Sequence, residues 1–154
     1  MRTAVESWIE EPLSRFIGDS RVRLVLLLEA SGRVLAQHGF TRSIDVMSAC
    51  ALAAAIHASA SEIGRQLDGT PFTTLHHPGR EHQIFLGELP TGRGVHILLT
   101  VFDEATSIGL VRLYFDELTR RLAAASPVAP TALPTFVDFE SDLNRNLAKL
   151  FGRI

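Results

Sequence analysis

Hydrophobic residues recur along this chain with two different periods, which together predict a mixture of helices and strands. Spacings of three and four residues predict helices over residues 5–17, 44–67 and 107–124. Short apolar runs bounded by turn residues predict strands over residues 22–28, 33–39, 72–76, 83–89 and 95–102. Because short turns join consecutive strands, we expect an antiparallel five-stranded sheet with helices on its faces, an α+β arrangement.

Three prolines within residues 126–134 cannot continue a helix, so they mark the end of a first domain at residues 1–125. Residues 126–135 form a linker to a short amphipathic segment, 136–154, which has acidic residues early and basic residues late, as the helix dipole favours. Its apolar stripe consists of Phe136, Phe139, Leu143, Leu147, Leu150 and Phe151. A short helix is marginal alone in water, so this segment either docks on its own domain as a lid or binds a partner as a tethered peptide.

The predicted helix over residues 44–67 has two contrasting sides, with a capping region at residues 41–45. One side is aliphatic, and we expect it to face the core: Leu52, Ile56, Ile63 and Leu67. The opposite side carries small or weakly polar residues where lysine and glutamate are expected: Met47, Cys50, Ala54, Ala58 and Ser61. An outer side so poor in charge predicts that a partner covers it. The alternatives are that alanine simply favours helices, or that a long neighbouring side chain shields this side.

Composition excludes several classes of function. The formal net charge is −2 and the isoelectric point is about 6.3, so we expect no nucleic-acid partner. A single cysteine rules out an internal disulfide framework and suits a reducing cytoplasm. Because charges and glycines interrupt the apolar stretches, we expect neither a signal peptide nor a membrane-spanning helix, and we place the protein in the cytoplasm.

No group of residues in the sequence assembles a catalytic site, so we predict no enzyme activity and no cofactor. His76, His77 and His82 surround a predicted hairpin turn, but neighbouring residues of a strand point to opposite faces, which makes shared metal ligation difficult. Cys50 lies in an apolar helix and is expected to be buried or interfacial. The glycine-rich stretch 87–94 lacks the lysine of a phosphate loop and is interpreted as a hairpin connection. A small-molecule or metal sensor that uses the histidine hairpin is a second hypothesis.

Three stretches resemble the roadblock (dynein light chain) family, and most closely its bacterial MglB-like branch. They are the hairpin RLVLLLEASGRVLA at 23–36, the Ile44-Asp45 entry to the alanine-rich helix, and the run VFDEATSIGLVRL at 101–113. The resemblance spans about residues 5–125. It implies a roadblock (profilin-like) sandwich in the order α-β-β-α-β-β-β-α with a five-stranded sheet. It also implies a homodimer with the sheet continued across two copies and the long helices side by side.

The same resemblance implies a small Ras-like GTPase of the MglA type as the partner, in bacterial cell polarity. Members of this branch raise GTP hydrolysis by arranging residues that the GTPase already owns, without inserting an arginine finger. By matching position, the contact falls on Ala51, Ala54, Ala55, Ala58 and Glu62, where Glu62 replaces a small residue. Tails in this branch touch the GTPase and favour nucleotide exchange, which assigns that contact here to Phe139, Leu143, Leu147, Leu150 and Phe151. Other roadblock proteins are scaffolds without effect on GTP turnover, which is the alternative.

Overall fold

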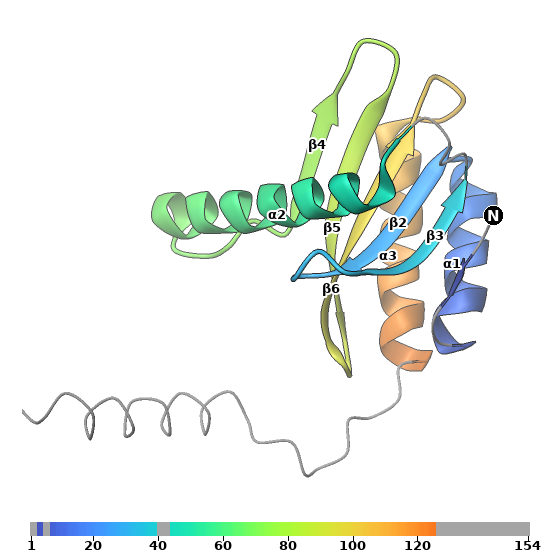
Figure 1. Cartoon of the computed structure of the whole chain (residues 1–154), viewed down its shortest axis with the longest axis horizontal. Helices are drawn as coiled ribbons and strands as arrows, with labels where there is room; N and C mark the ends of the chain where they lie inside the picture. Colours follow the sequence, from blue (N-terminus) through green and yellow to red (C-terminus); the bar gives the residue numbers. More distant parts are fainter. Residues whose placement is uncertain (1–2, 5–6, 40–43, 126–154) are drawn as a thin grey trace, which may run out of the picture.

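An antiparallel sheet separates two layers of helices in this chain (Figure 1). The computed structural model describes residues 3–4, 7–39 and 44–125. In this part of the chain, the sheet has six strands in the order β1-β3-β2-β6-β5-β4. The strands are β1 (Thr3–Ala4), β2 (Leu24–Glu29), β3 (Val34–Gly39), β4 (Thr74–Pro78), β5 (Gln83–Thr91) and β6 (Gly94–Phe102). The helices are α1 (Ser7–Ser20), α2 (Val46–Asp68) and α3 (Ile108–Ala125).

The predicted order of helices and strands is confirmed, with two differences in the strands. β1 was not predicted, because two residues are too few to form a pattern; it pairs with Ala36 and Gln37 on the outer edge of β3. β4 begins two residues later than predicted. Phe72 instead lies in the loop after α2, where its carbonyl oxygen accepts a hydrogen bond from Ser61 Oγ at 3.3 Å. This bond holds the chain beside α2 before it joins the sheet.

Alternation along the strands creates a core on each face of the sheet. Val25, Leu27 and Leu98 face α1 and α3, whereas Leu26 and Ile97 face α2, and all five are fully buried. Figure 1 shows α1 and α3 side by side behind the sheet and α2 crossing the strands on the other face.

Gly87 on β5 allows α3 to approach the sheet closely. A Cβ atom at Gly87 would lie 2.3 Å from Cζ of Phe115, a ring that also packs edge-on against Phe85 with centroids 4.9 Å apart. Only a residue without a side chain therefore fits between β5 and α3. The predicted linker 126–135 and the predicted helix 136–154 lie outside the described residues.

Candidate partner-binding surface on the long helix

Both ends of α2 are capped by local chemistry, as the sequence predicted for its start. Asp45 Oδ1 accepts hydrogen bonds from the backbone N–H groups of Met47 (3.1 Å) and Ser48 (3.3 Å), and Ser48 Oγ donates to Asp45 Oδ2 at 2.9 Å. These bonds, chiefly those from Ser48, hold the pKa of Asp45 below its ordinary value. At the other end, Gly69 adopts φ 76° and donates its N–H to the carbonyl of Arg65 at 3.0 Å. The caps define a 23-residue helix with fixed ends.

The side of α2 that faces the sheet is the side with small residues. Its buried residues are Cys50, Ala53, Ser61 and Gly64. A Cβ atom at Gly64 would lie 2.4 Å from the backbone nitrogen of Phe72, so the close approach requires glycine there. The buried thiol predicted for Cys50 is confirmed, and burial raises its pKa. Cys50 and Ser61, however, cannot form part of an exposed docking surface, and their assignment to one was wrong.

The aliphatic side of α2 faces solvent, so the expectation that it faces the core was wrong. The exposed fractions are 64% for Leu52, 37% for Ile56, 52% for Ile63 and 72% for Leu67. We call these four residues the aliphatic flank. The grouping by helical spacing was correct, but its orientation was reversed: the helix lies close to the sheet through its small residues, so its large residues remain outside.

A second exposed surface lies beside the flank on the solvent side of α2. It is formed by Ala51, Ala55 and Ala58, with Glu62 at its end, and we call it the alanine face. Met47 is also exposed, and Ala54 is half-buried at the margin. The helix carries no aspartate, glutamate, lysine or arginine from Val46 to Ser61. Glu62 binds Arg65 (3.0 Å) and Gln66 (3.2 Å), and these hydrogen bonds lower its pKa. The first two-thirds of the outer surface therefore present no charge to solvent.

The apolar character of α2 also bears on the membrane prediction. By length and mean hydropathy, 1.4 over its best 18-residue window, α2 meets the criteria for a membrane-spanning helix, and only 17% of that window is buried. The expectation that charges and glycines interrupt every apolar stretch was therefore wrong for α2. Such a helix is weak evidence for a membrane span, and here its inner side packs against Leu26 and Ile97 of the sheet.

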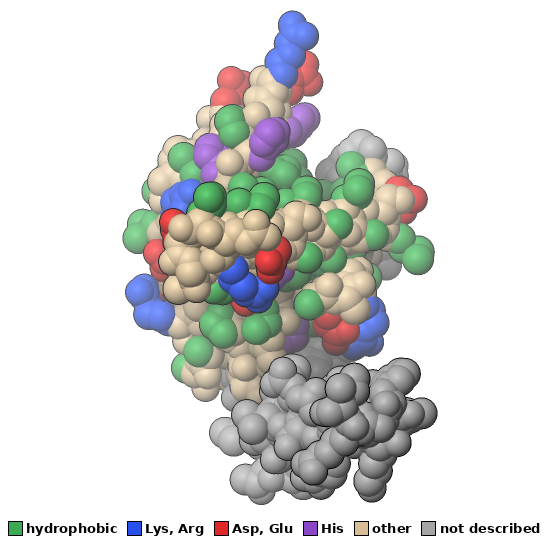
Figure 2. Space-filling view, turned by 90° about the vertical axis from the view of Figure 1, so that its left-hand side faces the viewer, with side chains coloured by type: hydrophobic (Ala, Val, Ile, Leu, Met, Phe, Trp, Pro, Cys, Tyr) green, Lys and Arg blue, Asp and Glu red, His purple; other side chains and the backbone are tan. Residues whose placement is uncertain are grey.

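One edge of the sheet next to α2 is open. β1 covers the outer edge of β3, whereas no strand in the described part of the chain pairs with the outer edge of β4. Figure 1 shows the C-terminal half of α2 extending beyond β4. Figure 2 looks at this end of the molecule and shows hydrophobic side chains gathered on the surface, with histidines among them. The open edge and the C-terminal part of the aliphatic flank, Ile63 and Leu67, thus lie at the same end of the molecule.

The histidines near the β4–β5 turn are separated by the strand, as predicted. His76 Nε2 lies 2.7 Å from Gln83 Oε1, and its ring stacks on Phe102 with centroids 6.0 Å apart, whereas His77 is exposed on the opposite face. His57, on α2, points inwards, with Nε2 3.6 Å from Glu88 Oε2. In the described ranges, no group of three or more His, Cys, Asp or Glu residues is arranged to hold a metal ion.

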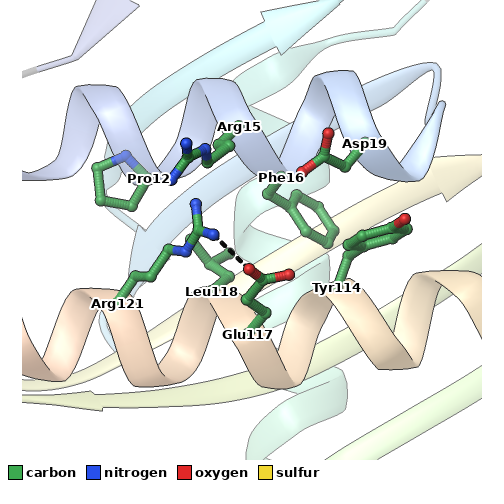
Figure 3. Close-up of a pocket in the computed structure, with 8 residues that line it drawn as sticks. All are labelled: Pro12, Arg15, Phe16, Asp19, Tyr114, Glu117, Leu118 and Arg121. Carbon is green, nitrogen blue, oxygen red and sulfur yellow. Dashed lines mark hydrogen bonds and ion pairs between the residues drawn. The ribbon is translucent and has the colours of Figure 1, made fainter.

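Three hollows lie away from α2. The middle of the groove between α1 and α3 (Figure 3) encloses only about 10 Å³, roughly the space of one water, because Phe16 and Leu118 close its floor and Arg121 pairs with Glu117 along its α3 rim. The open end of this groove, beside Ala124 and Ala125, encloses about 420 Å³. An open hollow of about 440 Å³ lies between the β4–β5 turn and Asp103, with His82 on its wall. Hydrogen bonds from the Ala105 N–H and from Arg23 (2.7 Å) lower the pKa of Asp103.

Comparison with known proteins agrees with this architecture. The family model described as Roadblock/LC7 domain matches residues 9–102. MglB from Myxococcus xanthus superposes with a TM-score of 0.69 at 24% identity, over 77% of this chain and 86% of that chain. The gliding protein MglB from Thermus thermophilus gives 0.68 at 22% identity, over 80% and 92%.

A more distant structural match is profilin IA from Acanthamoeba castellanii, with a TM-score of 0.53 at 18% identity over 77% of this chain and 98% of that chain. A search of curated proteins gave no match. At these identities the structural likeness shows the fold, and it confirms the predicted profilin-like order of elements.

Proposed function

The chain belongs to the Roadblock/LC7 family, and from that premise we propose that it is a homodimeric regulator of a small Ras-like GTPase. In this proposal the protein is not itself an enzyme. It binds the GTPase and raises GTP hydrolysis by arranging residues that the GTPase owns. The observation that carries the proposal is the outer surface of α2, which is uncharged from Val46 to Ser61 and has a row of exposed aliphatic side chains.

The aliphatic flank and the open β4 edge support self-association. Fully burying one exposed leucine or isoleucine contributes about 1.5–3 kcal/mol, and the four flank residues together expose the equivalent of about two such side chains in each copy. The unpaired edge of β4 offers backbone donors and acceptors to a second β4 strand. A two-fold axis beside β4 would let both surfaces pair at once, with the α2 helices of the two copies side by side.

The alanine face supports GTPase binding. In such a dimer the flanks face one another, so the alanine faces of both helices remain uncovered. Small side chains let the partner's backbone approach closely, and they lose little side-chain entropy on binding. Switch loops of a GTPase that are held against such a surface become ordered, which is a recognised way of controlling nucleotide hydrolysis. The partner-facing residues in this proposal are Met47, Ala51, Ala54, Ala55, Ala58 and Glu62.

The Ala58→Arg variant tests this proposal. Ala58 is exposed, so the substitution leaves the fold intact but places a long charged side chain in the centre of the alanine face. With a small Ras-like GTPase that binds the unchanged protein, we expect calorimetry to show loss of binding. Ala124→Arg, an exposed alanine on α3, is the matched control and should bind as the unchanged protein does.

GTP turnover, measured with and without the protein, separates activation from scaffolding. Binding without a change in turnover would favour the scaffold hypothesis. Unchanged affinity in Ala58→Arg would exclude the alanine face as the docking site. A role of residues 136–154 in nucleotide exchange remains a prediction from the family resemblance.

A further inference from the structure

The chain carries two long apolar surfaces for which the domain itself provides no packing partner among the described residues. One is the aliphatic flank of α2, which is exposed along its whole length. The other is the stripe that helical spacing assigns to residues 136–154, including Leu143 and Leu147. Exposed apolar surfaces of this size usually have a binding partner. Because both surfaces belong to one chain, each is always available to the other.

The two surfaces agree in length. From Leu52 to Leu67 the flank extends about 22 Å at 1.5 Å per helical residue, and from Phe139 to Phe151 the stripe would extend about 18 Å. Their charges also agree. The end of α2 carries Glu62, Arg65 and Asp68, of which Glu62 and Arg65 pair with each other at 3.0 Å, so one negative charge remains. The basic end of the segment, with Lys149 and Arg153, would lie beside it if the two helices run parallel. The acidic beginning of the segment would then lie beside the positive N-terminal end of α2.

The linker is long enough for this contact. α3 ends at Ala125 on the opposite side of the sheet from α2 (Figure 1). Packed layers are about 10 Å apart, so about 20 Å separates the two helical layers. A proline-rich stretch of the length of residues 126–135 would span about 31 Å if extended, at roughly 3.1 Å per residue. The segment can therefore pass around the sheet and reach the flank.

The nearer groove between α1 and α3 does not fit the segment. Its middle encloses only about 10 Å³, too little for a leucine or phenylalanine side chain (Figure 3). Its open end beside Ala124 and Ala125 encloses about 420 Å³, but the charged residues Glu11, Arg15 and Arg121 line it, and they suit an apolar stripe less well than the uncharged flank does. Phe16 and Leu118 already fill its floor. The observations therefore favour the flank over this groove as the surface that receives the stripe.

We propose that residues 136–154 dock along the aliphatic flank of α2 in the same chain and compete there with a second copy. A segment on a short linker acts at an effective concentration in the millimolar range, so it covers the flank when the protein is dilute. Dimerisation displaces it and frees it for other contacts. The competition rests on the proposed self-association, whereas the docking of the segment does not.

Isoleucine δ1-methyl NMR of the full chain, at a concentration low enough to keep it monomeric, tests the docking. Breaking the stripe with Leu143→Arg and Leu147→Arg should shift the methyl signals of Ile56 and Ile63, which lie on the flank. The signals of Ile9 and Ile97 are internal controls, because both residues are buried in the domain and should not move. A second variant, Arg145→Ala, changes the segment without touching its stripe and should leave all four signals in place.

Sedimentation equilibrium then measures the competition. The variant with the broken stripe should dimerise at least about tenfold more tightly than the unchanged chain, since it no longer loses the flank to its own tail. Unchanged Ile56 and Ile63 signals would overturn the docking. Signals that move in the unchanged chain only on raising its concentration would also overturn it, because the occupant would then be a second copy. A chain that stays monomeric while the flank signals shift would support the docking and refute the proposed homodimer.

Discussion

Replacing Ile63 with arginine should weaken the dimer without unfolding the domain. Ile63 is 52% exposed in the middle of the aliphatic flank, so covering it contributes on the order of 1 kcal/mol, about half of the value for a fully exposed isoleucine. A two-fold interface contains the substitution twice, which raises the loss to about 2 kcal/mol per dimer. An arginine in an uncharged interface adds a desolvation cost. We therefore expect the dissociation constant of the dimer to rise by at least roughly 30-fold.

Sedimentation equilibrium over a wide range of concentration measures this constant directly. Leu113→Arg is the matched control: Leu113 is 57% exposed, but it lies on α3, away from α2 and β4. Because both positions are exposed, both variants should stay folded, and at a dilution at which the chain is monomeric both should unfold at the same temperature as the unchanged protein. An Ile63→Arg protein that dimerises as tightly as the unchanged chain would refute the assignment of the flank to self-association. Equal weakening by both variants would refute it as well.

Two further predictions concern the framework that holds this surface. Gly87→Ala places a Cβ atom against the Phe115 ring and should lower the free energy of unfolding in urea by about 1–3 kcal/mol. In a protein that already carries Phe115→Leu, the same substitution should cost less, and an equal cost in both backgrounds would disprove the steric cause. Asp45→Ala should lower the midpoint of urea unfolding at pH 7. Because its folded-state pKa is lowered, Asp45 stabilises the fold above the ordinary aspartate pKa and loses this effect as the pH falls through the lowered value. The difference between the two proteins should therefore disappear in strong acid, and a difference that persists there would contradict this origin.

Local chemistry explains why the elements of the fold were predictable. The turn at Gly32 adopts φ 93°, and Asp45 caps α2, as residue types at those positions indicated. Short apolar runs bounded by turn residues likewise located the five longer strands. β1 escaped prediction because its pairing with β3 depends on the tertiary structure rather than on a pattern within two residues.

The orientation of α2 could not be predicted from hydrophobicity alone. A helical projection separates large from small residues, but it does not say which group the sheet requires. Here α2 lies close to the sheet and to the loop at Phe72. Cys50 and Gly64 therefore face inwards and Leu67 faces outwards. The family resemblance pointed to Ala51, Ala55 and Ala58, and these are exposed. The hydrophobic pattern identified the exposed Met47 and Ala58 but grouped them with the buried Cys50 and Ser61, whereas matching by position selected no buried residue.

The two-residue strand β1 limits how far an assembly of this protein can grow. A sheet with both margins unpaired can add copies at either end and extend into an endless ribbon, as aggregating β-proteins do. Thr3 and Ala4 occupy the margin at β3, so in the described part of the chain the sheet ends on one side in a strand of only two residues and on the other side in β4. A two-residue edge is a poor template for a further strand. Once two β4 strands pair, only these short edges remain, and growth stops at a finite particle.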